Sequence, residues 1–126
     1  VDYKTGKVLE DDENIDDTNA ESIADSIFSP DTKDRPKIAL QFYIYDMLLQ
    51  SRPDMAGKII WNSVYSTAHI FKNAPAAVQM NQKFYDAVSQ RLALLLNEMC
   101  DTDVPFRRTK DEKICSYCDF KMICGR

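Results

Sequence analysis

The amino-acid sequence predicts an α/β fold, and three stretches carry that prediction. The run Lys58–Tyr65 is rich in β-branched and aromatic residues and follows Gly57, which is typical of a strand. Residues 37–50 are apolar nearly all round, as expected of a buried helix. From about Ala77 to Met99 a stripe of apolar residues recurs at helical spacing, which predicts the longest helix of the chain; its members are Phe84, Val88, Leu92, Leu95 and Met99.

The other elements follow in chain order. Residues 1–7 are expected to form a strand that Gly6 allows to end sharply. Residues 10–17 are so acidic and poor in apolar side chains that they predict an exposed loop. A short amphipathic helix is expected over Glu21–Phe28, ended by Ser29-Pro30.

Two prolines mark the ends of the buried helix, and one more strand or loop is expected after the strand Lys58–Tyr65. Pro36 suits the first position of the helix over residues 37–50, and Pro53 lies beyond its end. A second strand or loop is expected through His69–Phe71, and the single histidine, His69, is interpreted as structural.

Composition limits the class of protein. The chain has 126 residues, 44% of them hydrophobic and 29% charged, which fits one globular domain. No apolar run reaches the ~18 residues of a membrane span and no signal peptide is visible, so a cytoplasmic location without membrane contact is expected. Because Val1 lies within an expected strand, we also expect the chain to be a fragment of a longer protein.

Charge is unevenly distributed along the chain. Residues 1–34 carry 3 basic and 11 acidic side chains, whereas residues 107–126 carry 6 basic and 3 acidic ones. The basic end is the part expected to face phosphate, although a solvated surface explains the same charges.

Asp2 and Lys4 form the first candidate for chemistry. In a strand, side chains two residues apart point to the same face, so this carboxylate and this ammonium would stand side by side. Hydrolysis of a phosphodiester uses such a pair, since a carboxylate can hold a divalent cation and an ammonium can stabilise developing negative charge. A strand end with a surface ion pair is the alternative interpretation of these two residues.

The cysteines form the second candidate. Cys115, Cys118 and Cys124 have the spacing C-x2-C-x5-C, which in a chain expected to be cytosolic predicts a metal or iron–sulfur site before disulfides. Cys100 could supply a fourth ligand, but it lies at the end of the long helix, where ordinary apolar packing is also expected. A ligand from residues upstream of Val1 is the other alternative.

Taken in order, Asp2-Tyr3-Lys4, Gln41-x3-Tyr45 and the three clustered cysteines resemble the RecB-like branch of the PD-(D/E)XK nucleases, in particular AddB-type domains with a C-terminal iron–sulfur motif. The resemblance implies a restriction-endonuclease-like mixed sheet flanked by helices and truncated at its N-terminus. Residues 1–106 would be the C-terminal part of the nuclease core, and residues 107–126 a Cys-rich tail.

The resemblance also implies roles. Asp2 and the backbone carbonyl of Tyr3 would bind Mg²⁺ or Mn²⁺, and Lys4 would be the catalytic lysine. Gln41 and Tyr45 would flank the active site and help hold the phosphate or the catalytic groups. Cys115, Cys118 and Cys124 would be three of the four ligands of a 4Fe-4S cluster, with the fourth upstream, which argues against Cys100.

The expected activity is metal-dependent hydrolysis of DNA in repair or recombination, as an exonuclease or an endonuclease, with a helicase subunit or a fused helicase domain as partner. The first metal-binding Asp of the family would lie before Val1, so the isolated chain is expected to have little or no nuclease activity. Two alternatives stay open. One is a catalytically inactive nuclease-like module that binds DNA or a partner; the other is a small zinc-binding module built on Cys100 and the three clustered cysteines.

Overall fold

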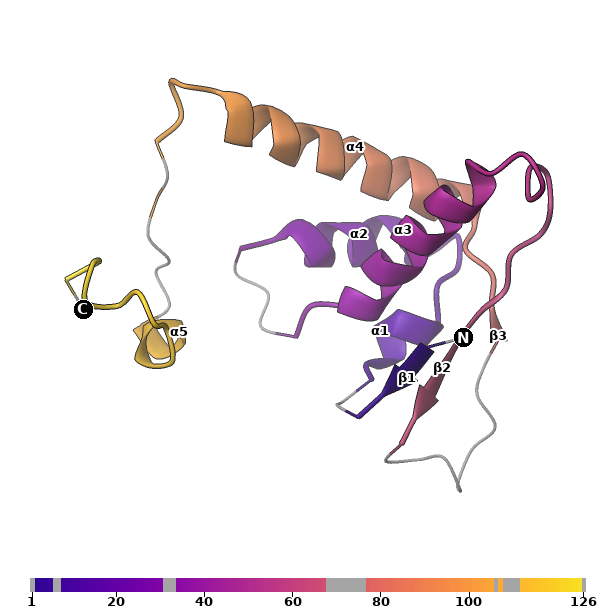
Figure 1. Cartoon of the computed structure of the whole chain (residues 1–126), viewed down its shortest axis with the longest axis horizontal. Coiled ribbons are helices and arrows are strands. Elements are labelled where there is room, and N and C mark those ends of the chain that lie inside the picture. The colour runs from indigo at the N-terminus through magenta and orange to yellow at the C-terminus, as the bar shows by residue number, and fades with distance from the viewer. Residues whose placement is uncertain are drawn as a thin grey trace. The chain divides into compact units, whose positions relative to one another are not determined.

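The computed structural model describes residues 2–5, 8–30, 34–67, 77–105, 107 and 112–125, with side chains except at positions 2, 3, 10, 11 and 114. The chain divides into two compact units, Val1–Leu95 and Leu96–Arg126. In Figure 1 the elements follow one another in this order: β1 (Asp2–Lys4), α1 (Glu10–Glu13), α2 (Ala20–Phe28), α3 (Lys37–Gln50), β2 (Asn62–Ser66), β3 (Ala77–Val78), α4 (Gln82–Cys100) and α5 (Glu112–Ser116). Among the described residues, no helix combines the length and the apolar character that a membrane crossing requires.

The first unit contains a three-stranded mixed sheet in the order β1-β2-β3. β1 pairs in parallel with β2, with Asp2 opposite Val64 and Lys4 opposite Ser66. β3 pairs antiparallel with β2, with Val78 opposite Asn62. A parallel pair needs a long crossover, and here α1, α2 and α3 provide it. The predicted α/β class with a mixed sheet is therefore confirmed.

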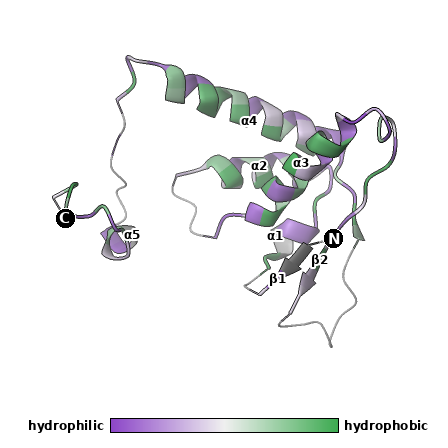
Figure 2. Cartoon of the chain, viewed as in Figure 1, coloured by the Kyte–Doolittle hydropathy of each residue, from purple (hydrophilic) through white to green (hydrophobic). Residues whose placement is uncertain are grey.

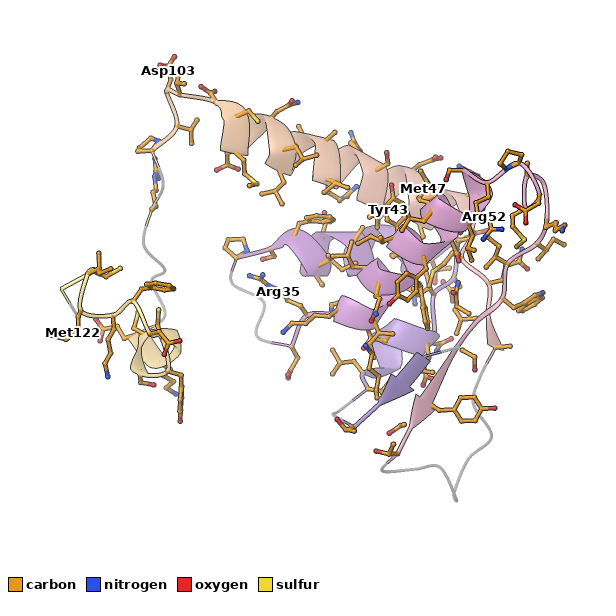
Figure 3. The ribbon with its side chains drawn as sticks, viewed as in Figure 1. Arg35, Tyr43, Met47, Arg52, Asp103 and Met122 are labelled. Carbon is orange, nitrogen blue, oxygen red and sulfur yellow. The ribbon has the colours of Figure 1, made fainter. Side chains whose placement is uncertain are left out.

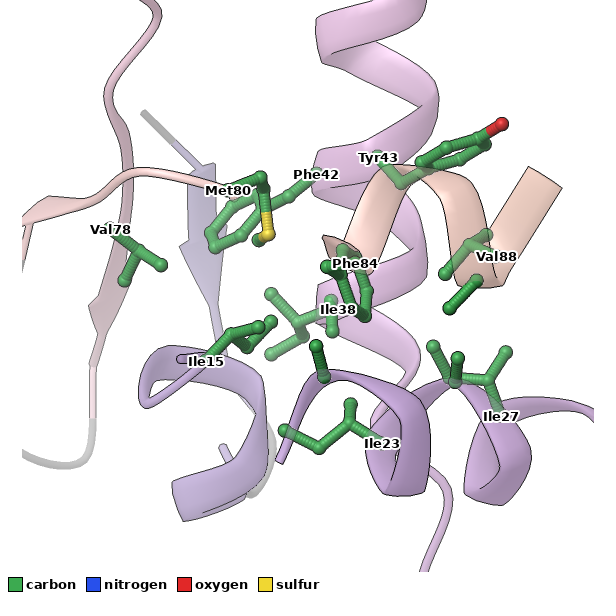
Figure 4. Close-up of a cluster of buried hydrophobic side chains, with 14 of the residues drawn as sticks. Ile15, Ile23, Ile27, Ile38, Phe42, Tyr43, Val78, Met80, Phe84 and Val88 are labelled. Atoms are coloured by element: carbon green, nitrogen blue, oxygen red, sulfur yellow. The ribbon is translucent and has the colours of Figure 1, made fainter. Parts of the chain in front are cut away.

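One hydrophobic core joins the sheet to the helices of this unit. Val64 and Val78 from the strands pack in the same cluster as Phe42 of α3 and Phe84 of α4. Figure 4 shows Phe84 among the apolar side chains of this cluster, which also include Ile23 and Ile27 of α2. The predicted helix over Glu21–Phe28 is confirmed, one residue longer at its start.

The helix predicted over residues 37–50 is confirmed as α3, but the prediction that it is buried all round is wrong for this chain. Its buried face consists of Ile38, Ala39, Phe42, Tyr43 and Asp46. The opposite side is exposed to solvent, including Met47 and Leu48 near the C-terminal end. Figure 3 shows Tyr43, Met47 and Arg52 along this helix and the turn after it. Pro36 occupies the N-cap position and not the first helical position that was predicted, since α3 begins at Lys37.

The prediction of an exposed loop over residues 10–17 is confirmed at Asn14, Asp16 and Asp17 but wrong at Glu10–Glu13 and Ile15. Glu10–Glu13 form the short helix α1, and Asp12 and Ile15 are buried. The acidic composition was misleading because backbone N–H groups surround the Asp12 carboxylate, which accepts hydrogen bonds from Leu9, Ile38 and Ala39.

The strand predicted over Lys58–Tyr65 begins four residues later than expected, at Asn62. Both neighbouring strands pair with β2 only from Asn62 onward, so the preceding residues have no ladder to join in the described sheet. Ile59 and Trp61 are accordingly exposed. Gly57, with φ of 74°, lies in the turn before them, in a conformation that glycine tolerates best.

The long helix begins later than predicted, at Gln82, because Ala77 and Val78 pair with β2 instead. Asn81 caps the helix by accepting a hydrogen bond from the Phe84 backbone N–H at 2.7 Å. The predicted stripe is buried only at its start, where Phe84 and Val88 are fully enclosed. The last turns of α4 are hydrophobic yet exposed, and Figure 2 shows green segments along this helix. The prediction of a core stripe is therefore wrong at Leu95 and Met99.

The strand or loop predicted through His69–Phe71 lies outside the described residues.

Candidate active site

Lys4 occupies the last position of β1, and its backbone is fixed there by the chain that leaves β2. The Thr67 backbone N–H donates to the Lys4 carbonyl at 2.9 Å, and the Thr67 hydroxyl donates to the same oxygen at 3.3 Å. These bonds continue the parallel pairing by one residue beyond the strands. The backbone of Lys4, from which the side chain extends, is thus fixed by the residue that follows β2.

The side chain of Lys4 reaches the helix α3. Its Nζ donates a hydrogen bond of 2.7 Å to Oε1 of Gln41, a residue 37 positions further along the chain. Gln41 in turn donates from Nε2 to the hydroxyl of Tyr45, one helical turn later. The structure therefore brings together three of the residues that the sequence singled out, Lys4, Gln41 and Tyr45.

The direction of this chain of hydrogen bonds follows from its members. A lysine ammonium can only donate, so the amide of Gln41 must turn its oxygen to Lys4 and its NH₂ group toward Tyr45. The Tyr45 oxygen then accepts, and its own proton points elsewhere. Because the Gln41 amide is neutral, it orients the ammonium of Lys4 without adding a negative charge beside it.

A buried polar network lies on the other face of α3. Asp46 is fully buried, and its carboxylate accepts two bonds of 2.9 Å from Asn62 Nδ2 of β2. The Tyr85 hydroxyl of α4 donates to Asp46 Oδ2 at 2.5 Å. Burial, followed by this hydrogen bond and the charge of Asp46, raises the pKa of Tyr85 above its ordinary value. The network ties α3 to β2 and α4 at Asp46, the residue that follows Tyr45 in the sequence.

These observations agree with the outcome of comparisons with known proteins. The sequence model described as PD-(D/E)XK nuclease superfamily matches residues 1–125, nearly the whole chain. The chain belongs to the PD-(D/E)XK nuclease superfamily. No curated protein and no solved structure gave a match.

Membership of the PD-(D/E)XK superfamily makes this a nuclease-type domain, and such nucleases typically use Mg²⁺ or Mn²⁺. Within the described residues, no group of three or more His, Cys, Asp or Glu side chains could hold a metal ion. The side chain of Asp2 is not among those that the structure describes. The described side chains therefore do not form a metal site by themselves.

The backbone of β1 sets the direction of the Tyr3 carbonyl, which the resemblance to the nucleases assigns to a metal. Carbonyl groups alternate in direction along a strand, and the Lys4 carbonyl points to β2, where Thr67 binds it. The Tyr3 carbonyl then points to the opposite edge of β1. That edge faces away from β2 and β3 in the described sheet.

All four cysteines belong to the second unit, and Cys100 is the last residue of α4. None of the four forms a disulfide. Cys100 is exposed, so the expectation of ordinary apolar packing for it is wrong; Cys115, Cys118 and Cys124 are half-buried. Cys115 lies on α5, and its carbonyl accepts from the Cys118 backbone N–H at 3.2 Å, which brings these two residues into one turn. An open hollow at Cys115 is lined by Glu112, Cys115, Ser116 and Lys121.

Sequence reasoning missed Thr67, Asp46 and Asp12, whose hydrogen bonds hold Lys4 and the helix α3 in place. Thr67 and Asp46 have ordinary neighbours in the sequence and carried no signal. Asp12 stands among other acidic residues, and nothing in that stretch distinguished it from a solvated carboxylate.

Proposed function

We propose that this chain supplies the lysine-bearing part of the active site of a metal-dependent DNA nuclease of the RecB-like, AddB-type branch. The observation that carries the proposal is the hydrogen bond of 2.7 Å between Lys4 Nζ and Gln41 Oε1. It joins the D-x-K strand to the Gln-x3-Tyr helix, two motifs that lie far apart in the sequence. A strand end with a surface ion pair would not require an amide acceptor on a neighbouring helix.

In this proposal, each residue has a distinct task. The Lys4 ammonium binds the scissile phosphate and stabilises the negative charge that develops on it. Gln41 fixes the direction of that ammonium. Tyr45, whose hydroxyl accepts from Gln41, donates its proton to a phosphate oxygen of the DNA.

The cofactor is proposed as Mg²⁺ or Mn²⁺, held by the Asp2 carboxylate, the Tyr3 carbonyl and the carboxylate expected upstream. When bound, such an ion supplies positive charge against the phosphate and lowers the pKa of a bound water. The direction of the Tyr3 carbonyl, away from β2, supports this assignment, because a carbonyl turned into the ladder would be occupied by a backbone N–H.

The tail is proposed to hold a 4Fe-4S cluster through Cys115, Cys118 and Cys124, with a fourth cysteine from elsewhere in the protein. Thiolates are the usual ligands of such clusters, and the turn from Cys115 to Cys118 brings two of them close in the chain. A role in DNA repair or recombination together with a helicase follows from the same resemblance. The alternative of a zinc site that includes Cys100 is favoured by the exposure of Cys100.

The test is cleavage of end-labelled linear DNA by the longest polypeptide that contains this sequence, with Mg²⁺, with Mn²⁺ and with EDTA. We expect Lys4→Ala to lower the rate by about 10²-fold or more, as removal of one transition-state donor does elsewhere. Lys58→Ala is the matched control, because Lys58 is exposed and its ammonium, within the described part of the chain, donates only to the Met55 sulfur. Equal rates for the Lys4 and Lys58 variants would refute the catalytic assignment and support the inactive binding module.

Gln41 offers a second, sharper comparison. Gln41→Ala removes the acceptor, whereas Gln41→Glu keeps an oxygen in place and adds a negative charge beside Lys4 and the phosphate. If the neutral amide matters, Gln41→Glu should be at least as inactive as Gln41→Ala. A fully active Gln41→Glu variant would show that only the acceptor, and not its neutrality, is needed.

A further inference from the structure

The helix α3 begins without a side-chain cap of its own. Its N-cap residue, Pro36, has no polar side chain and makes no capping hydrogen bond. The next residues, Ile38 and Ala39, are buried, so water cannot easily replace the missing partners of their backbone N–H groups. An acceptor from another part of the chain has to satisfy them.

Asp12 of α1 is that acceptor. Its Oδ1 accepts from the backbone N–H of Ile38 at 2.9 Å and of Ala39 at 3.0 Å. Its Oδ2 accepts from the backbone N–H of Leu9 at 3.1 Å. The side chain is only 2% exposed, and its charge faces the positive end of a helix of 14 residues.

The position of Asp12 in the chain connects this cap to the proposed site. Asp12 follows Lys4 by eight residues, and Gln41 follows Ile38 by three, which is roughly 4.5 Å along a helix axis. One carboxylate therefore ties the first turn of α3 to the segment that leaves β1. The bond between Lys4 and Gln41 joins β1 to α3, and the Asp12 bonds join α1 to the first turn of the same helix. A shift of about 1 Å of α3 relative to β1 would break the Lys4–Gln41 bond.

We infer that Asp12 is a positioning residue of the proposed nuclease site, which sets the start of α3 so that Gln41 meets Lys4. This inference rests on the proposed function. Asp12 does not touch the substrate; it acts through Gln41. Its loss lowers the rate of the chemical step more than it weakens binding of DNA.

The test uses Asp12→Asn, which keeps the size of the side chain but turns an NH₂ group toward at least one of the three N–H donors. Val88→Ala is the control for lost stability, because Val88 is fully buried in the same core but is apolar and does not bind the backbone N–H groups of Ile38 and Ala39. We call the hydrogen bonds from the Ile38 and Ala39 backbone N–H groups to Asp12 the clamp. Amide hydrogen exchange under native conditions measures directly how well these N–H groups are protected. We expect Asp12→Asn to speed exchange in the peptide that covers Ile38–Phe42, and Val88→Ala to leave that peptide no faster than the rest of the unit.

The link to Gln41 is measured by a double-mutant cycle on the nuclease rate. Asp12→Asn should lower kcat by about 10-fold with KM for DNA changed less than about twofold, and should have less than about a twofold effect in a Gln41→Ala background. Equal effects in both backgrounds, or a loss confined to KM, would overturn the positioning role while leaving the nuclease assignment intact. Unchanged exchange would overturn the clamp itself. A wild-type polypeptide without nuclease activity would overturn the proposed function and with it any positioning role, even if the exchange result showed the clamp.

Discussion

The hydrogen bond from Tyr85 to Asp46 gives a quantitative test of the network behind α3. Tyr85→Phe removes one hydroxyl and leaves the aromatic ring, whose centroid lies 5.7 Å from that of Tyr43. The change therefore deletes a single donor to a buried carboxylate, at 2.5 Å, without opening a large cavity. Asp46 keeps its two bonds from Asn62.

The expected loss follows from the charge and burial of the acceptor. A hydrogen bond to a charged group contributes roughly 1.5–3 kcal/mol. Because Asp46 is fully buried while Tyr85 is half-buried, we expect the free energy of unfolding to fall by about 2 kcal/mol. With an m-value of about 2 kcal/mol per molar urea, the midpoint of unfolding falls by roughly 1 M.

The same variant changes the pH dependence of stability. The pKa of Tyr85 is raised in the folded protein, first by burial and then by its bond to Asp46 and the charge of that carboxylate. In the unfolded chain a tyrosine loses its proton near pH 10. The contribution of Tyr85 is thus complete below about pH 10 and is lost as the pH rises above it, because only the unfolded state releases the proton.

Urea unfolding followed by circular dichroism, at pH values from 6 to 11, measures both effects. The difference in stability between wild type and Tyr85→Phe should stay constant to about pH 9 and shrink above pH 10. Tyr117→Phe is the control, since Tyr117 is 92% exposed and should change stability by less than about 0.5 kcal/mol. A Tyr85→Phe variant as stable as wild type at pH 7 would refute the network's contribution.

Three further results are expected. Phe84→Ala should lower the free energy of unfolding by about 3–5 kcal/mol, and Leu94→Ala by less than about 0.5 kcal/mol in the same assay, because Phe84 is fully buried and Leu94 is 62% exposed. Arg91→Ala should cost no more than about 1 kcal/mol, and less at high salt, because its partners on α2 are more than half exposed; thermal unfolding at two salt concentrations measures this. In elemental analysis of anaerobically purified protein, Cys118→Ser should lose the bound metal while Cys100→Ser retains iron; stoichiometric zinc that is lost with Cys100→Ser would support the zinc module instead.

Patterns in the sequence predicted those features that depend on local spacing. The ends of α3 follow from Pro36 and from the apolar run between the two prolines, and the proximity of Gln41 and Tyr45 follows from helical geometry. The start of β2 could not be predicted, because it depends on where β1 and β3 find partners rather than on the residues of the run itself. The pairing of Ala77 with β2 overrode a helical pattern for the same reason.

The site shows the same division between local and distant causes. Asp2-x-Lys4 and Gln41-x3-Tyr45 are visible as motifs, but no local rule states that Lys4 donates to Gln41, 37 positions further along the chain. Asp12 and Asp46 were the least predictable residues. A carboxylate in an acidic run, or next to an apolar stretch, is usually solvated, and only the distant backbone or side-chain donors make its burial favourable.

Two buried carboxylates, Asp12 of α1 and Asp46 of α3, hold the helix that carries Gln41 and Tyr45. Asp12 binds the first turn of α3, and Asp46 binds β2 and α4 through neutral donors. Both contacts lie against the core, so the side of α3 that bears Gln41 and Tyr45 needs no apolar packing to stay in place. The helix can therefore expose a glutamine and a tyrosine toward Lys4 while its position relative to the sheet is set from the other side.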